Sequence, residues 1–389
     1  MYISAYTHRR QLFHITERWL SNQLAPDDAL QVTRIITYDG FIAWHTLLDF
    51  AQTLTRRLDN AKIRTLPLYC KKDLKDFITA TCPTSSPRAA ELIANYRRLP
   101  EYYYVGSPMT GYLFHDSDGR VLSICRFKRT KRIAEKASRY AALHIRERLK
   151  QHSEKLMHET GAASATQDTP AAEFQRRAEE DLMATIRDGG LKLPRLEMKI
   201  RDVVGAKIID WGFGAEGLEA ALKDLPRVRI LEKEIHRGVY NAIHYAIGLQ
   251  VEPDPILAAF AASTHRQTCR RRGLSTGDGT ADFDAFLHNG VADVSLDLIL
   301  TTYEELLESE IGRSMHEARI FRQRQEESLI GNIPANIGHI IEYLLAVGLS
   351  PVTRIDEIPI KLWGRYLPDT LSYCIRKLYG IPEYTLIDN

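Results

Sequence analysis

Two aspartates lie in apolar segments and carry side chains that could bind a divalent cation. Asp202 opens the segment "DVVGAKIID", and Asp297 interrupts the segment "VSLDLILTT". Both segments are short, apolar and rich in β-branched residues, which predicts strands. Two carboxylates at the ends of neighbouring strands suit Mg²⁺, which takes its remaining ligands from water and substrate phosphates. The simpler alternatives are that Asp202 caps a turn and that Asp297 faces solvent on the open side of a sheet.

Cationic side chains precede the first of these segments. From Arg126 to Lys150 the chain has ten Lys or Arg and two Glu, and "RFKRTKRIAEK" begins where a predicted strand runs into a helix. The free N–H groups and the dipole at a helix start favour anions, so this junction could hold phosphates. A second basic segment spans residues 266–272. A solvated helix face would explain either segment alone, but two of them at a net charge of +2 favour a polyanionic ligand.

Tyr240 and His244 form a third candidate set, within "HRGVYNAIHYAIGL". In a strand, residues four apart lie on the same face of the sheet. An aromatic ring and an imidazole on one face could stack on a nucleobase and contact a phosphate. The alternative is a half-buried tyrosine with a structural role.

The composition excludes several classes of protein. The 389 residues are enough for two or three domains, and the apolar and charged fractions, 44% and 26%, are those of ordinary globular proteins. No apolar run approaches the roughly 20 residues that span a bilayer, and the first residues are charged where a signal peptide would be apolar. We therefore expect no membrane partner. Five cysteines without a CxxC spacing indicate reduced thiols and a cytoplasmic protein.

The order of predicted elements indicates a mixed α/β (α+β) fold, in which a mixed sheet with flanking helices lies between helical N- and C-terminal extensions. Residues 1–105 are expected to form a helical region and residues 331–389 a small helical one. Residues 106–330 alternate strands and helices, with an insertion at about 150–190. Within that insertion, residues 159–175 are small and polar, which predicts a linker.

Local patterns predict several elements of the central region. A hairpin is expected at Asp118-Gly119. Single helices are expected over 254–273 and 304–327, with a loop over 273–284. The helix after the hairpin should bury one face, and the residues on that face are Ile133, Ala137, Tyr140 and Ala141.

Taken in order, these segments resemble the synthetase domain of the RelA/SpoT family, the (p)ppGpp or alarmone synthetases. That family has the motifs R-x-K-x-x-x-S-I-x-x-K, D-x-x-G-x-R-I, G-Y-x-S-x-H and E-x-Q-x-R-T. Counterparts of all four occur in the same order over residues 111–319, about half of the chain. The matching positions are Arg126, Lys128, Ile133, Lys136, Asp202, Gly205, Tyr240, His244, Asp297 and Thr302.

The resemblance implies a nucleotidyltransferase-like sheet and Mg²⁺-dependent transfer of pyrophosphate from ATP to the 3′ hydroxyl of GDP or GTP. In some relatives the acceptor is the 3′ end of tRNA, and family members often form homo-oligomers. Asp202 and Asp297 would be the catalytic and metal-binding residues, and Tyr240 and His244 would bind the acceptor. The residues that would bind ATP phosphates are Arg126, Lys128, Arg132, Lys136 and Lys207.

The chain departs from the family motifs at five positions. Arg132 replaces a serine and Lys207 an arginine, while Asp297, Ile299 and Thr301 replace glutamate, glutamine and arginine. A lysine offers a point charge where arginine binds phosphate in a bidentate manner, and threonine offers no charge. These departures favour an alternative, in which the chain is a catalytically inactive RelA/SpoT-like module that binds nucleotides or RNA and acts as a regulatory protein.

Overall fold

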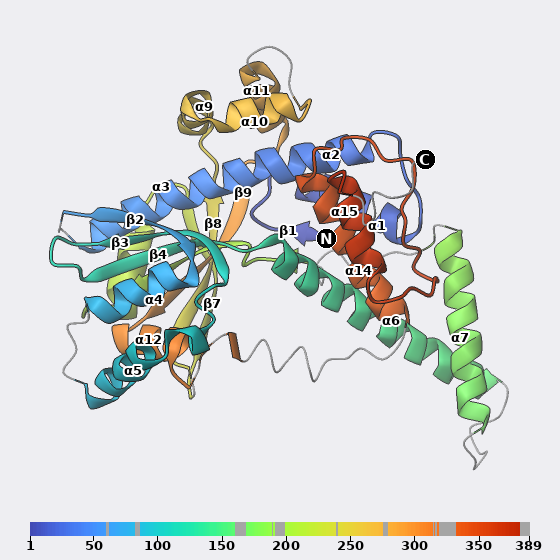
Figure 1. Ribbon diagram of the computed structural model, residues 1–389, viewed down its shortest axis with the longest axis horizontal. Helices are drawn as coiled ribbons and strands as arrows, with labels where there is room; N and C mark the ends of the chain where they lie inside the picture. The colour runs from blue at the N-terminus through green and yellow to red at the C-terminus, as the bar shows by residue number, and fades with distance from the viewer. Residues whose placement is uncertain are drawn as a thin grey trace.

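One seven-stranded mixed sheet with helices on both faces forms the centre of the computed structural model (Figure 1). The structure describes residues 1–59, 62–81, 86–159, 169–188, 190, 199–238, 240–274, 279–313, 315, 317–318 and 332–381. A second, small sheet has two parallel strands, β1 (Tyr2–Ile3) and β5 (Lys199–Ile200). The predicted mixed α/β class is confirmed.

The strand order of the large sheet is β2-β3-β4-β6-β9-β8-β7. Its strands are β2 (Arg64–Cys70), β3 (Pro108–His115), β4 (Val121–Phe127), β6 (Val204–Ile209), β7 (Val228–His236), β8 (Ala242–Gln250) and β9 (Asp293–Thr301). Neighbours are antiparallel except β6 and β9, which are parallel. β3 and β4 form the hairpin predicted at Asp118-Gly119, where Gly119 takes the positive φ of 83° that such turns favour.

The two faces of the sheet contact different sets of helices (Figure 1). In β9, Leu296, Leu298 and Leu300 are buried in the larger core, which includes residues of α3 (Gly40–Leu58) and α8 (Gly214–Lys223). Because side chains alternate along a strand, Asp297 points to the opposite face. A smaller core forms on that face between the sheet and three helices, α4 (Lys71–Ala80), α5 (Pro87–Arg98) and α12 (Tyr303–Ile311).

The two ends of the chain pack together beside the sheet. Helices α1 (Arg9–Leu20) and α2 (Asp28–Arg34) contact α14 (Asn332–Leu349), which lies along α6 (Thr130–Glu159) (Figure 1). Trp19 donates a hydrogen bond from Nε1 to Asp28 at 3.0 Å, and its ring lies 6.2 Å from that of Tyr343. The helices at the two ends of the chain therefore share one core with the sheet.

The buried face of α6 is the predicted one. Ile133, Ala137 and Ala141 are buried, and Tyr140 packs partly buried against the same core. The remaining helices of the described ranges are α7 (Thr169–Arg187), α9 (Pro253–Ala262), α10 (His265–Arg271), α11 (Thr280–Asn289), α15 (Thr370–Leu378), a π-helical turn (Ile35–Asp39) and a 3₁₀ turn (Pro100–Tyr103). Within these ranges no helix combines the length and apolar character needed to cross a bilayer.

One strand of the sheet was not predicted. β2 lies within residues 1–105, which were expected to be mainly helical, and it pairs with β3. Pro67 lies within β2, and a proline is tolerated there because β2 is an edge strand of the sheet. The sheet therefore begins before the expected boundary at residue 105.

The single helix predicted over 254–273 is instead two helices, α9 and α10, separated at Ser263. Ser263 has an extended backbone with ψ of 153°, and its Oγ donates to the carbonyl oxygen of Phe260 at 2.9 Å. A hydroxyl bonded to the preceding turn competes with the helical hydrogen bonds, which accounts for the break.

Other predicted boundaries differ by several residues. The helix expected over 304–327 ends at Ile311, where α12 stops, and residues 319–327 lie outside the described ranges. Helix α7 begins at Thr169, inside the segment predicted as a linker, whereas residues 160–168 of that segment also lie outside the description. Helix α11 begins at Thr280, inside the predicted loop.

The pairing of β3 with β4 has a strict requirement at Gly111. A Cβ at this position would lie 2.3 Å from the carbonyl oxygen of Cys125, so Gly111→Ala must move one of the two strands. We expect this substitution to lower the free energy of unfolding in urea by about 1–3 kcal/mol. The matched control is Gly106→Ala, because a Cβ at Gly106 meets nothing within 4 Å. Equal losses of stability in the two variants would contradict the close approach.

Candidate active site

The parallel pairing of β6 with β9 brings Asp202 and Asp297 together. Gly205 lies opposite Asp297 in the register of these strands, and Asp202 precedes β6 by two residues. A Cβ at Gly205 would lie 2.8 Å from the backbone oxygen of Asp297 and 3.4 Å from its Cβ, so glycine permits this close approach. The charge of Asp202 contributes to the raised pKa of Asp297. The two carboxylates therefore share one electrostatic environment.

Two lysines neutralise the charge of Asp202. Lys128, just after β4, donates to one carboxylate oxygen, and Nζ of Lys136 on α6 lies 2.9 Å from the other. Burial alone would raise the pKa of Asp202, but the charges of these lysines outweigh it and hold the pKa at about 2. The backbone N–H of Lys128 donates to Val203 at 2.7 Å, which fixes the end of β4 beside the start of β6. Asp202 is thus ionised across the physiological pH range.

The pKa of Asp297 is shifted in the opposite direction from that of Asp202. Burial and the neighbouring charge of Asp202 raise its pKa to about 6, while Lys128 and Lys136 partly oppose the rise. Two adjacent acids whose pKa values are pushed apart can divide their roles, one remaining a fixed charge and the other exchanging a proton. A carboxylate with a pKa near neutrality is suited to act as a general base.

A second group of charges on the same face joins the sheet to α12. Arg126 on β4 donates to Glu310 at 2.5 Å, and Lys71 lies 3.2 Å from Glu310 and 2.7 Å from Glu317. Lys207 on β6 donates to Ser309 at 3.2 Å. Burial is the main cause that lowers the pKa of Lys207 to about 8, and the charge of Glu310 partly opposes it. Arg126 and Lys207, predicted to bind phosphate, are therefore held by α12 in this structure.

Glu310 was missed in the sequence, although a signal was present. It shares one helical face with Leu306, Leu307 and Ile311, and all four side chains are buried. An acid on the apolar face of an amphipathic helix indicates a buried partner of opposite charge. The pKa of Glu310 is well below its usual range because Arg126 and then Lys71 outweigh the effect of burial.

Strand β9 lies between β6 and β8, and the remaining two candidate residues belong to the β8 side. His244 is on β8, and Tyr240 precedes β8 by two residues. The ring of His244 is 6.2 Å from that of Tyr240 and 4.3 Å from that of His236. Burial, followed by the charges of His236 and Lys207, lowers the pKa of His244 to about 4, so its imidazole is neutral at pH 7. Its Nε2 atom is buried without a hydrogen-bond partner among the described residues. A ligand group could satisfy this nitrogen.

The predicted phosphate-binding residues therefore occupy three different settings. Lys128 and Lys136 surround Asp202, whereas Arg126 and Lys207 contact α12. Arg132 donates to Glu135 at 2.7 Å within the first turns of α6, so its guanidinium is engaged by its own helix. Of the predicted phosphate-binding residues, the two that converge on the aspartates are Lys128 and Lys136.

The donor set around these aspartates fits one kind of metal site. No group of three or more His, Cys, Asp or Glu side chains suited to a metal occurs within the described ranges, so these residues form no closed structural site. Mg²⁺ commonly binds through one or two carboxylates, with water and substrate phosphates completing its octahedral shell. Asp202 and Asp297 fit this mode, and metal binding would replace at least part of the lysine contacts to Asp202.

Comparisons of the chain with protein-family models, with curated proteins and with solved structures find no match.

The contribution of the ion pairs of the buried Glu310 to stability can be tested by substitution. Glu310→Gln would leave Arg126 without its counter-charge and Lys71 with Glu317 alone, and we expect the free energy of unfolding to fall by about 3 kcal/mol. Glu304→Gln, an exposed position on the same helix, is the matched control and should change it by less than about 1 kcal/mol. Both values can be measured by urea denaturation at pH 7. A Glu310→Gln protein as stable as the control would show that this ion pair does not hold α12 on the sheet.

The raised pKa of Asp297 predicts a stability that depends on pH. The folded state favours the protonated acid, so this contribution is complete below pH about 4 and is lost as pH rises through about 6. In buffer with EDTA, Asp297→Asn should therefore be more stable than the wild type at pH 7.5, by roughly 1 kcal/mol, and this advantage should vanish near pH 4. Asp293→Asn changes an exposed acid on the same strand and should show no such gain. A loss of stability in Asp297→Asn at pH 7.5 would assign Asp297 a structural role.

Proposed function

We propose that this chain transfers pyrophosphate from ATP to the 3′ hydroxyl of a guanine nucleotide, in the manner of the RelA/SpoT-like synthetases that its motifs resemble. The observation that carries the proposal is the pair of carboxylates formed by Asp202, just before β6, and Asp297 on β9, with Lys128 and Lys136 beside Asp202. Phosphoryl-transfer sites need such a combination, because a carboxylate pair can bind a metal and nearby cations can bind phosphates.

The reaction assigns a separate task to each aspartate. The 3′ oxygen of the acceptor forms a bond to the β-phosphorus of ATP, the bond from that phosphorus to the oxygen of the α-phosphate breaks, and AMP leaves. Asp297 would accept the proton of the attacking hydroxyl, a role that its raised pKa supports. Asp202, with Asp297, would hold Mg²⁺, which would neutralise charge on the triphosphate when bound.

Cations around the aspartates would bind the triphosphate. Lys128 and Lys136 now contact Asp202, and a bound triphosphate would compete for both ammonium groups. Arg126 borders the same face and would bind a terminal phosphate if it left Glu310. Most of the rate gain would come from alignment and from stabilisation of charge.

The aromatic side chains at the start of β8 would bind the acceptor. Burial lowers the pKa of Arg126, Glu310 is the main cause that raises it, and Tyr240 makes a smaller contribution, so a base stacked on Tyr240 would lie beside the phosphate-binding cations. The unsatisfied Nε2 of His244 would contact the ribose or phosphate of the acceptor. A mononucleotide, GDP or GTP, is the proposed acceptor, and the 3′ end of a tRNA is the alternative. The reaction would take place in the cytoplasm, where these nucleotides are available.

A second function is favoured by the contacts of Arg126 and Lys207. Both cations are held by residues of α12, and Thr301 stands where the family motif has an arginine. A module in which these contacts persist would bind nucleotides or RNA through its remaining cations without catalysis. Its affinity for tRNA would fall steeply with salt, because phosphate contacts release counterions.

Release of AMP is the measurement that tests the proposed reaction. With ATP, GDP and Mg²⁺, the wild-type protein should release AMP, and EDTA should abolish the release. We expect Asp202→Ala and Asp297→Asn each to lower kcat by roughly a hundredfold or more, since each removes a group from the reacting centre. Asp293→Ala, on the same strand but exposed, is the matched control and should retain full activity.

The same preparation separates the two functions. Binding of tRNA on filters at two salt concentrations, without AMP release from any nucleotide or tRNA acceptor, would favour the regulatory module. Full activity in Asp202→Ala would remove Asp202 from the mechanism.

A further inference from the structure

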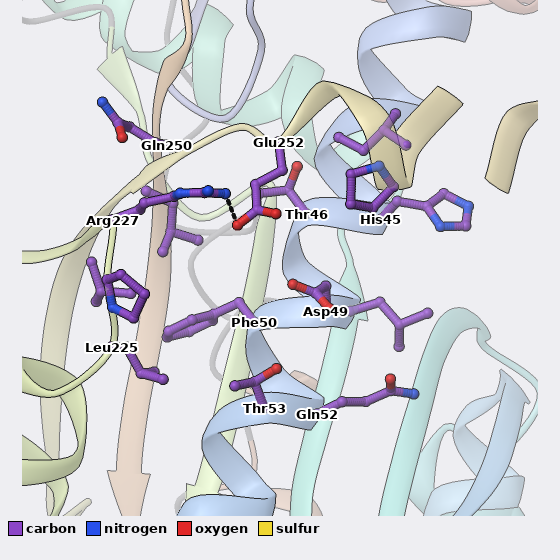
Figure 2. Close-up of a pocket in the computed structure, with 16 residues that line it drawn as sticks. His45, Thr46, Asp49, Phe50, Gln52, Thr53, Leu225, Arg227, Gln250 and Glu252 are labelled. Carbon is purple, nitrogen blue, oxygen red and sulfur yellow. Dashed lines mark ion pairs between the residues drawn. The ribbon is translucent and has the colours of Figure 1, made fainter. Parts of the chain in front are cut away.

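Figure 2 shows a pocket of about 430 Å³. It is lined by Leu249, which by the register of β8 with β9 lies on the face of the sheet opposite to Asp297. Its walls are α3, the turn between α8 and β7, and the end of β8 with the start of α9. None of the residues predicted to bind ATP, metal or acceptor lines it. The pocket is therefore separate from the candidate active site.

The floor of this pocket is apolar and its rim is polar. Phe50, Leu225, Leu249 and Ile256 line it and are buried in the core, so their positions are fixed by packing. A small number of polar side chains around an apolar floor is the usual composition of a small-molecule site. The volume suits a small organic molecule.

An ion pair closes one side of the rim. Arg227 pairs with Glu252, and Figure 2 shows this pair beside the pocket. Arg227 has a φ of 68°, which is uncommon for a residue other than glycine, and its carbonyl oxygen accepts the N–H of Gln250 at 3.1 Å. Strained backbone of this kind concentrates at ligand sites. The charge of Arg227 is compensated by Glu252 and is not left for an anionic ligand.

Asp49 is an exposed residue on the rim of the pocket, and its charge is not compensated by any described residue. It makes no hydrogen bond or ion pair with any other residue that the structure describes, and in Figure 2 its carboxylate points into the space beside Phe50. His45, one turn earlier on α3, is neutral at pH 7 because burial and then the charge of His265 lower its pKa. The ionisable groups of the lining thus leave one negative charge, at Asp49.

We propose that this pocket binds a small organic cation, a primary amine with an apolar body. The ammonium group would bind Asp49, and the apolar body would cover Phe50 and Leu249. Anionic ligands such as nucleoside triphosphates are disfavoured, because they would meet an uncompensated carboxylate. This selectivity is the reverse of that proposed for the other face of the sheet.

Calorimetric titration with benzylamine tests the proposal on the full chain. Benzyl alcohol and benzoate have the same ring with a neutral or an anionic group. The wild-type protein should bind benzylamine saturably and at least roughly threefold more tightly than the other two, because an ion pair with an exposed carboxylate contributes about that much. Asp49→Asn should weaken benzylamine binding at least roughly threefold. Asp356→Asn removes the same charge from a side chain that is 95% exposed elsewhere, and it should leave binding unchanged.

A second variant separates loss of the charge from loss of the fold. Thr53 lies on the exposed rim of the pocket, so Thr53→Trp should fill the space and abolish binding while the melting temperature changes little. Absence of benzylamine binding to the wild type would overturn the proposal. Equal binding of benzoate, or unchanged binding in Asp49→Asn or Thr53→Trp, would overturn it as well. None of these results depends on pyrophosphate transfer.

Discussion

The parallel pairing of β6 with β9 is the constraint on which the candidate active site depends. Its register sets Gly205 against Asp297, and the missing Cβ lets the two strands keep that register. Asp202 then lies at the entry to β6, where Lys128 and Lys136 keep it ionised. Its fixed charge, together with burial, raises the pKa of Asp297. One backbone register thus produces two carboxylates of different proton affinity.

The cations of this face already have partners in the structure. Lys128 and Lys136 contact Asp202, and Arg126 contacts Glu310 beneath α12. Such pairs offset the large cost of burying a single charge, but they also mean that a polyphosphate must compete with protein carboxylates. Catalysis would require these cations to leave the protein carboxylates for the polyphosphate. In a binding module, the contact of Arg126 with Glu310 would persist. The difference between the two proposed functions is therefore a difference in how readily Arg126 on β4 leaves Glu310 on α12.

The two faces of the sheet have different chemistry although they share the same strands. In β8, His244 belongs to the face of Asp297, while Leu249 lines the pocket on the other side. Cations predominate around the first face, and in the pocket on the second face Asp49 is the lining carboxylate that no described residue compensates. Alternation along a strand allows this separation, because neighbouring residues project to opposite sides. If both proposals hold, the sheet would serve two ligands of opposite charge.

The sequence by itself determined the local features of the protein. Alternation in β9 was enough to place its three leucines away from Asp297, because strand geometry depends on adjacent residues alone. The tertiary structure decided which strands are neighbours, that Glu310 is buried between α12 and the sheet, and that α3 and the turn at Arg227 enclose a pocket. Pairing, burial and electrostatic coupling join segments that are distant in the chain, and their energies arise only when the whole core has formed. Local pattern therefore predicted β6, β9 and the candidate acids, but not the edge strand β2 or the partners that set the charge of those acids.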